Sequence, residues 1–234
     1  MRSSLEPKPP AAVLFDLDGT LFDRERAVRD LFAAQHAAFQ SELGGVTRHA
    51  YVARLLELDA HGHADKRQVF AVLVRELGLD AELGQRLLEH FRSSYTNFGS
   101  TFADALPTLR ELRARGLELG LVTNGLVRVQ EDKIRRLGLE PFFKAVLISE
   151  REGVRKPERQ IFERALGRLG VAAEQAWHVG DHPVADVAGA HAAGLTAVWR
   201  YAPYWPEPAT CSHMILELAE LITLLDQPDQ ARVS

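Results

Sequence analysis

The sequence predicts a doubly wound α/β fold, a parallel sheet with helices on both faces, into which a second, all-helical domain is inserted. Short apolar runs alternate along most of the chain with segments whose apolar residues recur every three or four positions, which is typical of buried strands followed by helices. One stretch, from Phe22 to about Phe98, contains helical patterns with no strand between them. We therefore expect residues 23–98 to form a helical cap domain, and residues 1–22 and 99–234 to form the α/β core.

Five apolar runs are predicted to be the strands of the core, because continuous apolar runs of this length indicate strands buried on both faces. They are residues 11–15, 117–122, 145–148, 177–179 and 195–199. Helices that connect the last four strands are predicted at 126–137, 161–169 and 184–193. Strands that alternate with helices in this way run parallel to one another.

Four helices are predicted in the inserted segment, separated by breaks that contain glycine or polar residues. Their expected ranges are 25–43, 47–58, 65–77 and 81–98. Asp65, followed three residues later by Gln68, has the pattern of a capping box and marks the start of the third helix. Thr47 can cap the second helix.

Composition and charge exclude several classes of protein. Of the 234 residues, 46% are hydrophobic and 26% are charged, which argues against a disordered or fibrous chain. The net charge of −4 gives no reason to expect a nucleic-acid polymer as partner. The single cysteine, a first segment (residues 1–10) without the apolar core of a signal peptide, and the lack of a long apolar run favour a cytoplasmic protein that does not enter a membrane. We expect a monomer or a homodimer.

Polar residues follow the predicted strands at their carboxyl ends, the edge at which parallel sheets bind ligands. The first strand leads into Asp16, Asp18 and Thr20, the second into Thr123, Asn124 and Gly125, and the fourth into Asp181 and then Asp186. Lys156 lies at the entry to the helix after the third strand. Carboxylates gathered at one edge repel one another, and a hard divalent cation, Mg²⁺, would relieve that repulsion. Together with a lysine, such a cation suits a phosphate or another dianion.

Two of these acids have the spacing that phosphoryl transfer needs. A carboxylate can attack phosphorus as a nucleophile and form an aspartyl-phosphate. A second carboxyl group is then needed to protonate the leaving oxygen and later to deprotonate the attacking water. Asp16 and Asp18 are separated by one residue, so in a continuing strand their side chains point to the same side.

Four motifs resemble those of the haloacid dehalogenase superfamily. They are Asp16-Leu-Asp-Gly-Thr-Leu21, Thr123-Asn-Gly125, Lys156-Pro157 and Gly180-Asp-His-Pro-Val-Ala-Asp186, in this order and each after a predicted strand. The helical insert directly after the first motif also resembles the cap of that superfamily. The resemblance implies a Rossmann-like core with a helical cap. It favours the phosphatase branch, because the true dehalogenases lack an acid at the position of Asp18.

The resemblance also assigns the metal site and the reacting groups. It implies that Asp16 is the nucleophile and a ligand of Mg²⁺, and that Asp18 is the general acid and base. Asp18 would also give its backbone carbonyl to the metal, and Asp181 would be the third protein ligand. Asp186 and Thr20 would lie next to these ligands without contacting the metal directly.

The remaining motif residues would bind the phosphate. The resemblance implies that Thr123, Asn124 and Gly125 hold the phosphoryl oxygens, and that Lys156 neutralises charge between the nucleophile and the phosphate. The expected reaction is Mg²⁺-dependent hydrolysis of a small phosphorylated metabolite.

Several alternatives remain open at this point. On the same scaffold the chain could be a phosphomutase, a carbon–halogen hydrolase or a non-catalytic ligand-binding module. Asp18 argues against the halide reaction, and the intact set of acids with Lys156 argues against an idle site. Taken singly, Asp181 could also be a helix cap before Pro183.

Overall fold

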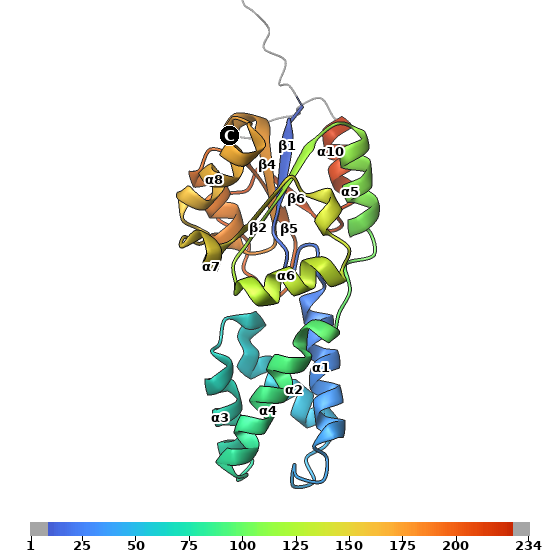
Figure 1. Cartoon of the computed structure of the whole chain (residues 1–234), viewed down its shortest axis with the longest axis vertical. Coiled ribbons are helices and arrows are strands. Elements are labelled where there is room, and N and C mark those ends of the chain that lie inside the picture. The colour runs from blue at the N-terminus through green and yellow to red at the C-terminus, as the bar shows by residue number, and fades with distance from the viewer. Residues whose placement is uncertain (1–8, 227–234) are drawn as a thin grey trace, which may run out of the picture. The chain divides into compact units, whose positions relative to one another are not determined.

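The computed structural model describes residues 9–226 and shows two compact units, Met1–Phe22 with Thr101–Ser234, and Asp23–Ser100. The first unit contains the sheet and is called the core unit below. The second contains helices alone among its described elements and is called the helical unit (Figure 1). Most of the segment considered for a signal peptide, residues 1–8, lies outside the described residues.

The core unit is built on one parallel sheet of six strands in the order β3-β2-β1-β4-β5-β6. The strands are β1 Ala12–Phe15, β2 Glu118–Thr123, β3 Ala145–Ile148, β4 Ala176–Gly180, β5 Thr196–Arg200 and β6 His213–Ile215. The predicted doubly wound fold is confirmed, and its five predicted strands are all present. The sixth, β6, was not predicted because it is three residues long and lies at the edge of the sheet, where burial imposes no clear apolar pattern.

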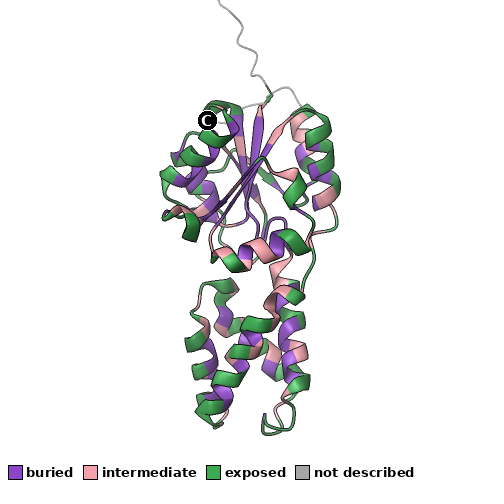
Figure 2. Cartoon of the chain, in the orientation of Figure 1, coloured by how far each residue is buried: buried purple, intermediate pink, exposed green. Residues whose placement is uncertain are grey.

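Helices cover both faces of this sheet. Leu14 of β1 and Leu147 of β3 pack with Ile161 and Phe162 of α8 (Arg159–Leu169) in one buried cluster. On the opposite face lie α5 (Ala105–Ala114) and α10 (Glu220–Asp226), as Figure 1 shows. The strands between the two layers are mostly buried, with the edge strand β6 the more exposed (Figure 2). Because β1 and β4 are enclosed on both sides, they form a rigid support for the residues that follow them.

The helices of the core unit depart from the prediction in four places. They are α5 Ala105–Ala114, α6 Val127–Arg136, α7 Ser149–Glu152, α8 Arg159–Leu169, α9 Gly189–Ala192 and α10 Glu220–Asp226. Of these, α5, α7 and α10 were not predicted. The helix expected at 184–193 is a π-helical segment, Pro183–Ala188, followed by α9, and Val187 N–H donates to the carbonyl of His182.

The helical unit has its own hydrophobic core. Its helices are α1 Arg24–Ala38, α2 Arg48–Asp59, α3 Lys66–Glu76 and α4 Ala81–Ser94. The side-chain oxygens of Thr47 and Asp65 accept backbone N–H groups at the starts of α2 and α3, so both predicted caps are present. The first helix ends at Ala38, before the predicted residue 43, and Leu43 is buried from the turn that follows.

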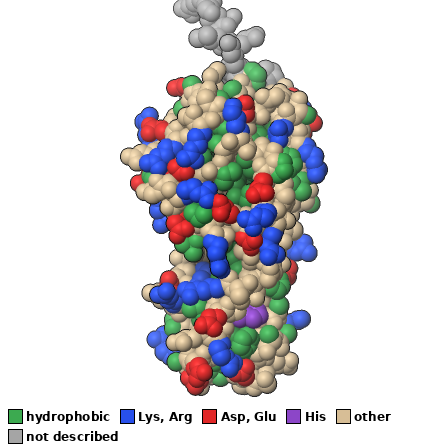
Figure 3. All heavy atoms as spheres, viewed as in Figure 1, with side chains coloured by type: hydrophobic (Ala, Val, Ile, Leu, Met, Phe, Trp, Pro, Cys, Tyr) green, Lys and Arg blue, Asp and Glu red, His purple; other side chains and the backbone are tan. Residues whose placement is uncertain are grey.

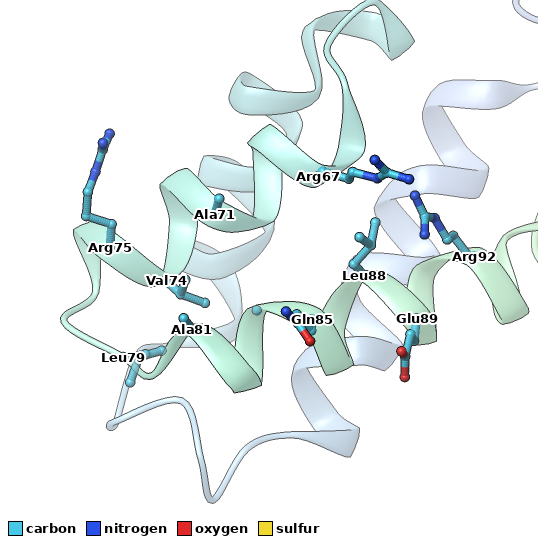
Figure 4. Close-up of a pocket in the computed structure, with 11 residues that line it drawn as sticks. Arg67, Ala71, Val74, Arg75, Leu79, Ala81, Gln85, Leu88, Glu89 and Arg92 are labelled. Atoms are coloured by element: carbon cyan, nitrogen blue, oxygen red, sulfur yellow. The ribbon is translucent and has the colours of Figure 1, made fainter.

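A surface groove of about 670 Å³ lies between α3 and α4 of the helical unit (Figure 4). Val74 and Leu88 are among its apolar lining residues, and Arg67 and Arg92 also line it. Among its lining residues Glu89 is the one carboxylate, so the groove lacks the clustered acids that the predicted chemistry requires.

The surface carries charges of both signs. On the face shown in Figure 3, Lys and Arg side chains are interspersed with Asp and Glu. Within residues 9–226, no helix has the length and apolar character needed to cross a membrane.

Candidate active site

The candidate site lies where the strand order of the core sheet reverses. Strand β1 has β2 on one side and β4 on the other, so three carboxyl ends meet at the point where open α/β sheets bind ligands. Asp16 directly follows β1, Thr123 closes β2 and Asp181 directly follows β4. The registers pair Phe15 with residues of both neighbours, which brings the three ends level.

Three carboxylates meet at this edge. Asp16, Asp181 and Asp186 each offer an oxygen, and these oxygens lie within 4.8 Å of one another. The three residues are only 6%, 5% and 1% exposed. The Lys156 ammonium lies between two of them, 2.5 Å from Oδ1 of Asp16 and 2.6 Å from Oδ1 of Asp186.

The proton affinities of these carboxylates differ with their neighbours. Burial raises the pKa of Asp16 well above its ordinary value despite the opposing charge of Lys156, and Asp186 and Asp181 raise it further. Burial and then Asp186 raise the pKa of Asp181 to about 6. Burial acts in the same direction on Asp186, but Lys156 and His178 outweigh it and hold the pKa of Asp186 below its ordinary value. In the absence of a cation, the ionised forms of Asp16 and Asp181 are therefore not fully compensated by neighbouring positive charge.

These residues fit a hard divalent cation. Carboxylate oxygens are the ligands that Mg²⁺ takes in proteins, and one cation would stabilise the ionised forms of Asp16 and Asp181. The loop after β1 also leaves room beside Asp181, because Gly19 has φ +87° and a Cβ there would lie 2.5 Å from Oδ2 of Asp181. Thr20 Oγ1 donates to Oδ1 of Asp181 over 3.3 Å.

Asp186 is held by neighbours on several sides. Besides Lys156, the ring Nε2 of His178 lies 3.1 Å from its Oδ1, and the backbone N–H of His182 donates to its Oδ2. A Cβ at Gly180 would lie 2.3 Å from the Cβ of Asp186, so a glycine is required where the two segments meet. His182, whose Nδ1 accepts two backbone N–H groups, caps the following π-helical segment, so Asp181 is not the cap.

Asp18 lies outside the group of three carboxylates. Its two oxygens are 2.5 and 2.6 Å from the Lys133 ammonium, and Gln130 Nε2 donates to its Oδ2 over 2.8 Å. The same nitrogen of Gln130 donates to Oγ1 of Thr123 over 2.6 Å. The structure thus brings Asp18 and Thr123 together through one side chain.

Asn124 and Gly125 shape the loop after β2. The Asn124 side chain accepts from the backbone N–H of Lys156 and donates to its carbonyl, at 2.9 and 3.0 Å. The N–H of Gly125 donates to the Ser149 hydroxyl. In this structure the Asn124 amide therefore fixes the segment that carries Lys156.

Further residues at the site were not predicted, among them Gln130, Lys133, His178 and Trp205. The Trp205 indole N–H donates to Oδ2 of Asp181 over 3.1 Å, and the Tyr204 hydroxyl is 3.4 Å from the same atom. The apolar pattern of α6 does not indicate that Gln130 and Lys133 face the inside of the protein. The spacing of Gln130 and Lys133, which places them on one side of a helix that begins right after a motif, was the available signal.

Residues 10–194 match the family model of the haloacid dehalogenase-like hydrolases. The chain is 35% identical over 194 residues to a glyceraldehyde 3-phosphate phosphatase of Methanopyrus kandleri, covering 80% of this chain and 82% of the relative. It is 34% identical to a ribulose-1,5-bisphosphate 5-phosphatase of Halopiger xanaduensis, covering 80% and 83%. Its fold is similar to that of the putative HAD-hydrolase YfnB of Bacillus subtilis bound to magnesium, with a TM-score of 0.71, 26% identity and coverage of 94% and 100%.

Proposed function

Since the chain belongs to the haloacid dehalogenase-like hydrolase family, with phosphoric monoester hydrolases among its relatives, we propose that it is a Mg²⁺-dependent phosphatase of a small phosphorylated metabolite that acts through an aspartyl-phosphate. The observation that carries the proposal is the buried group of Asp16, Asp181 and Asp186 with Lys156 among them. Three buried acids and one lysine leave an excess of negative charge, which a divalent cation would balance.

Asp16 is the proposed nucleophile. It directly follows a buried strand, is almost fully enclosed, and is held by Lys156, so its carboxylate has one orientation. Asp16, Asp181 and the backbone carbonyl of Asp18 would hold Mg²⁺, which when bound neutralises the phosphoryl oxygens. Lys156 supplies the second positive charge, and Asp186 and Thr20 orient Lys156 and Asp181 respectively.

Asp18 is the proposed general acid and base. As Asp16 attacks phosphorus, the bond from phosphorus to the leaving oxygen breaks, and Asp18 gives that oxygen its proton. Asp18 then takes a proton from the water that hydrolyses the aspartyl-phosphate. With a side chain 23% exposed, Asp18 can reach both a substrate and water.

Thr123 is the proposed donor to the phosphoryl group. Its hydroxyl accepts a hydrogen bond from Gln130, so its own proton is directed to another acceptor. We assign the backbone of Asn124 and Gly125 to the wall of the phosphate site, and the Asn124 side chain to holding Lys156 in place.

The proposed substrates are small phosphate esters such as those named for the relatives, among them glyceraldehyde 3-phosphate and ribulose 1,5-bisphosphate. The helical unit, residues 23–100, is the proposed cap domain that distinguishes between leaving groups. A phosphomutase is the alternative that uses the same groups of the core unit, and it would retain phosphate on the product. Asp18 argues against a carbon–halogen hydrolase, because that reaction needs no general acid at this position. The buried carboxylate of Asp16 beside Lys156 argues against a module that only binds a ligand.

The test is release of inorganic phosphate from a panel of phosphorylated metabolites and one aryl phosphate, with Mg²⁺ and after exhaustive chelation. We expect Asp16→Asn to abolish turnover while keeping the fold, because an amide is a poor nucleophile and a poor metal ligand. Asp30→Asn, at an exposed aspartate of α1 that pairs with Arg26, is the matched control and should retain full activity. Borohydride should trap the aspartyl-phosphate on Asp16 by reducing it to an alcohol.

The outcomes separate the alternatives. Full activity without metal would contradict the role of Asp16 and Asp181 as ligands. Transfer of phosphate to a second position of the product, without release, would favour the phosphomutase. No reaction with any member of the panel would contradict the proposed function.

A further inference from the structure

Two side chains of α6 hold the carboxylate of Asp18. The Lys133 ammonium contacts both of its oxygens, at 2.5 and 2.6 Å, and Gln130 adds a third contact at 2.8 Å. With three contacts on two oxygens, the carboxylate is fixed in both position and tilt. Neither Lys133 nor Gln130 belongs to the four motifs that predicted the site.

Lys133 is a buried lysine of α6 whose ammonium is paired with Asp18. Its side chain is 3% exposed, and its ammonium lies 5.2 Å from the centre of the Phe22 ring. A buried cation is unfavourable unless it is paired, so its pairing with Asp18 fixes where it lies. Ordinary surface lysines of this protein differ: Lys144, paired with Glu118, has a side chain 48% exposed.

Gln130 connects Asp18 to the phosphate side of the site. Its amide nitrogen donates to Asp18 and to the Thr123 hydroxyl, and an ionised carboxylate accepts but does not donate, which sets the orientation of the amide. A single planar group thus sets the distance between the proposed acid and the proposed phosphoryl donor.

We propose that Lys133 and Gln130 are positioning residues for proton transfer by Asp18 to the leaving oxygen, an inference that rests on the proposed phosphatase function. They need not touch the substrate. In the free protein they hold the ionised Asp18 carboxylate in place. For the acid step Asp18 takes up a proton on one oxygen, which exchanges one of these contacts, and passes it to the leaving oxygen as the bond from that oxygen to phosphorus breaks. Their removal should therefore slow the step that needs an acid and leave substrate binding intact.

The experiment measures single-turnover rates for an alkyl and an aryl phosphate in the wild type, Lys133→Met, Asp18→Asn and the double variant. Met keeps the length and apolar contacts of the lysine stem and removes its charge. We expect Lys133→Met to slow the alkyl ester by about 10²-fold, within the range for loss of a general acid, and the aryl ester much less. The KM should change by less than about threefold, because ground-state binding is not affected.

The double variant provides the decisive comparison. If Lys133 acts through Asp18, its removal in the Asp18→Asn background should cause no further loss, since residues that act as a unit are not additive. Gln130→Leu should also slow the alkyl ester more than the aryl ester, with a smaller loss, and serves as the second variant if Lys133→Met does not fold. Part of its loss should remain in the Asp18→Asn background, because Gln130 also contacts Thr123. Lys144→Met is the control, and should behave as the wild type.

The possible results are distinguishable. Equal and additive losses with both esters, or wild-type rates in Lys133→Met together with a slow Asp18→Asn, would overturn this inference and leave the phosphatase function standing. A wild type that hydrolyses neither ester would overturn the proposed function and this inference with it.

Discussion

The indole N–H of Trp205 donates to Oδ2 of Asp181 over 3.1 Å, and the indole of Trp199 donates to the backbone carbonyl of the same residue over 2.7 Å. Two tryptophans thus hold Asp181. Trp205 contacts its carboxylate, and Trp199 contacts its main chain. Asp181 is a proposed ligand of Mg²⁺, and groups that orient a ligand contribute to metal affinity.

We expect Trp205→Phe to weaken Mg²⁺ binding by about tenfold, the lower end of the range for loss of such an orienting group. The measurement is a Mg²⁺ titration followed by calorimetry and by tryptophan fluorescence, with no substrate present. Trp177→Phe is the matched control, because Trp177 packs against His213 away from the acidic group. Equal Mg²⁺ affinities in the two variants would contradict the role of Trp205.

The metal-free protein should lose stability through Asp181 as the pH rises from its ordinary pKa of 3.8 to about 6. In this window the folded state retains a proton that the unfolded state has released, so deprotonation costs the folded state more. Asp181→Asn removes this loss. Its free energy of unfolding relative to the wild type should therefore increase across the window, on the order of 1–3 kcal/mol.

Urea unfolding at several pH values in the presence of a chelator measures this difference. Saturating Mg²⁺ should abolish it, because the cation favours the ionised carboxylate. If the difference in free energy of unfolding between Asp181→Asn and the wild type is constant from pH 4 to 6, the proposed effect of Asp181 is wrong.

Lys156→Met should both inactivate and destabilise the protein. It leaves Asp16 and Asp186 buried without their shared cation, and breaking one partner of a buried pair costs about 3–5 kcal/mol. Adding Asp186→Asn should restore part of the stability and none of the activity. Unfolding midpoints in urea and phosphate release report the two effects, and Lys144→Met should be neutral in both.

Gly180→Ala should destabilise the core unit by about 1–3 kcal/mol, because its Cβ would overlap the side chain of Asp186. Gly167→Ala is the control. Gly167 lies in α8 with no atom within 4 Å of an added Cβ, so alanine should be neutral or stabilise the helix. Thermal unfolding midpoints compare the two variants. Equal midpoints would show that the segment of Asp186 can move to accommodate the methyl group without loss of stability.

The sheet and the motif residues were accessible from the sequence because both depend on local patterns. A buried parallel strand is a continuous apolar run, and the ends of β1, β2 and β4 are marked by Asp16, Thr123 and Asp181. Once strands are placed, topology alone brings these residues to one edge. The roles of the motif residues stay proposals, since they came from the resemblance and not from packing.

Other features depend on contacts between distant residues, which a single sequence does not encode locally. Lys133 resembles an ordinary surface lysine until the fold places Asp18 beside it, 115 residues away in the chain. Trp205 follows β5 in a proline-rich loop, and nothing there indicates that its indole reaches Asp181. Strand β6 escaped notice because a short edge strand is stabilised by its one neighbour, β5, more than by its own sequence.

The chain leaves the core unit after Phe22 and returns to it at Thr101. In the core unit, the N–H of Phe102 donates to the carbonyl of Leu21, and in the helical unit the N–H of Asp23 donates to the carbonyl of Ser100, each over 3.0 Å. Each unit thus has its two chain ends side by side, as in a hairpin. In evolutionary terms the helical segment can change as a unit. A longer insert, a short turn or a different insert could join the same two chain ends of the core unit. The free-energy cost of closing such a loop grows only slowly with its length. Specificity can then diverge while the reacting residues remain where they are.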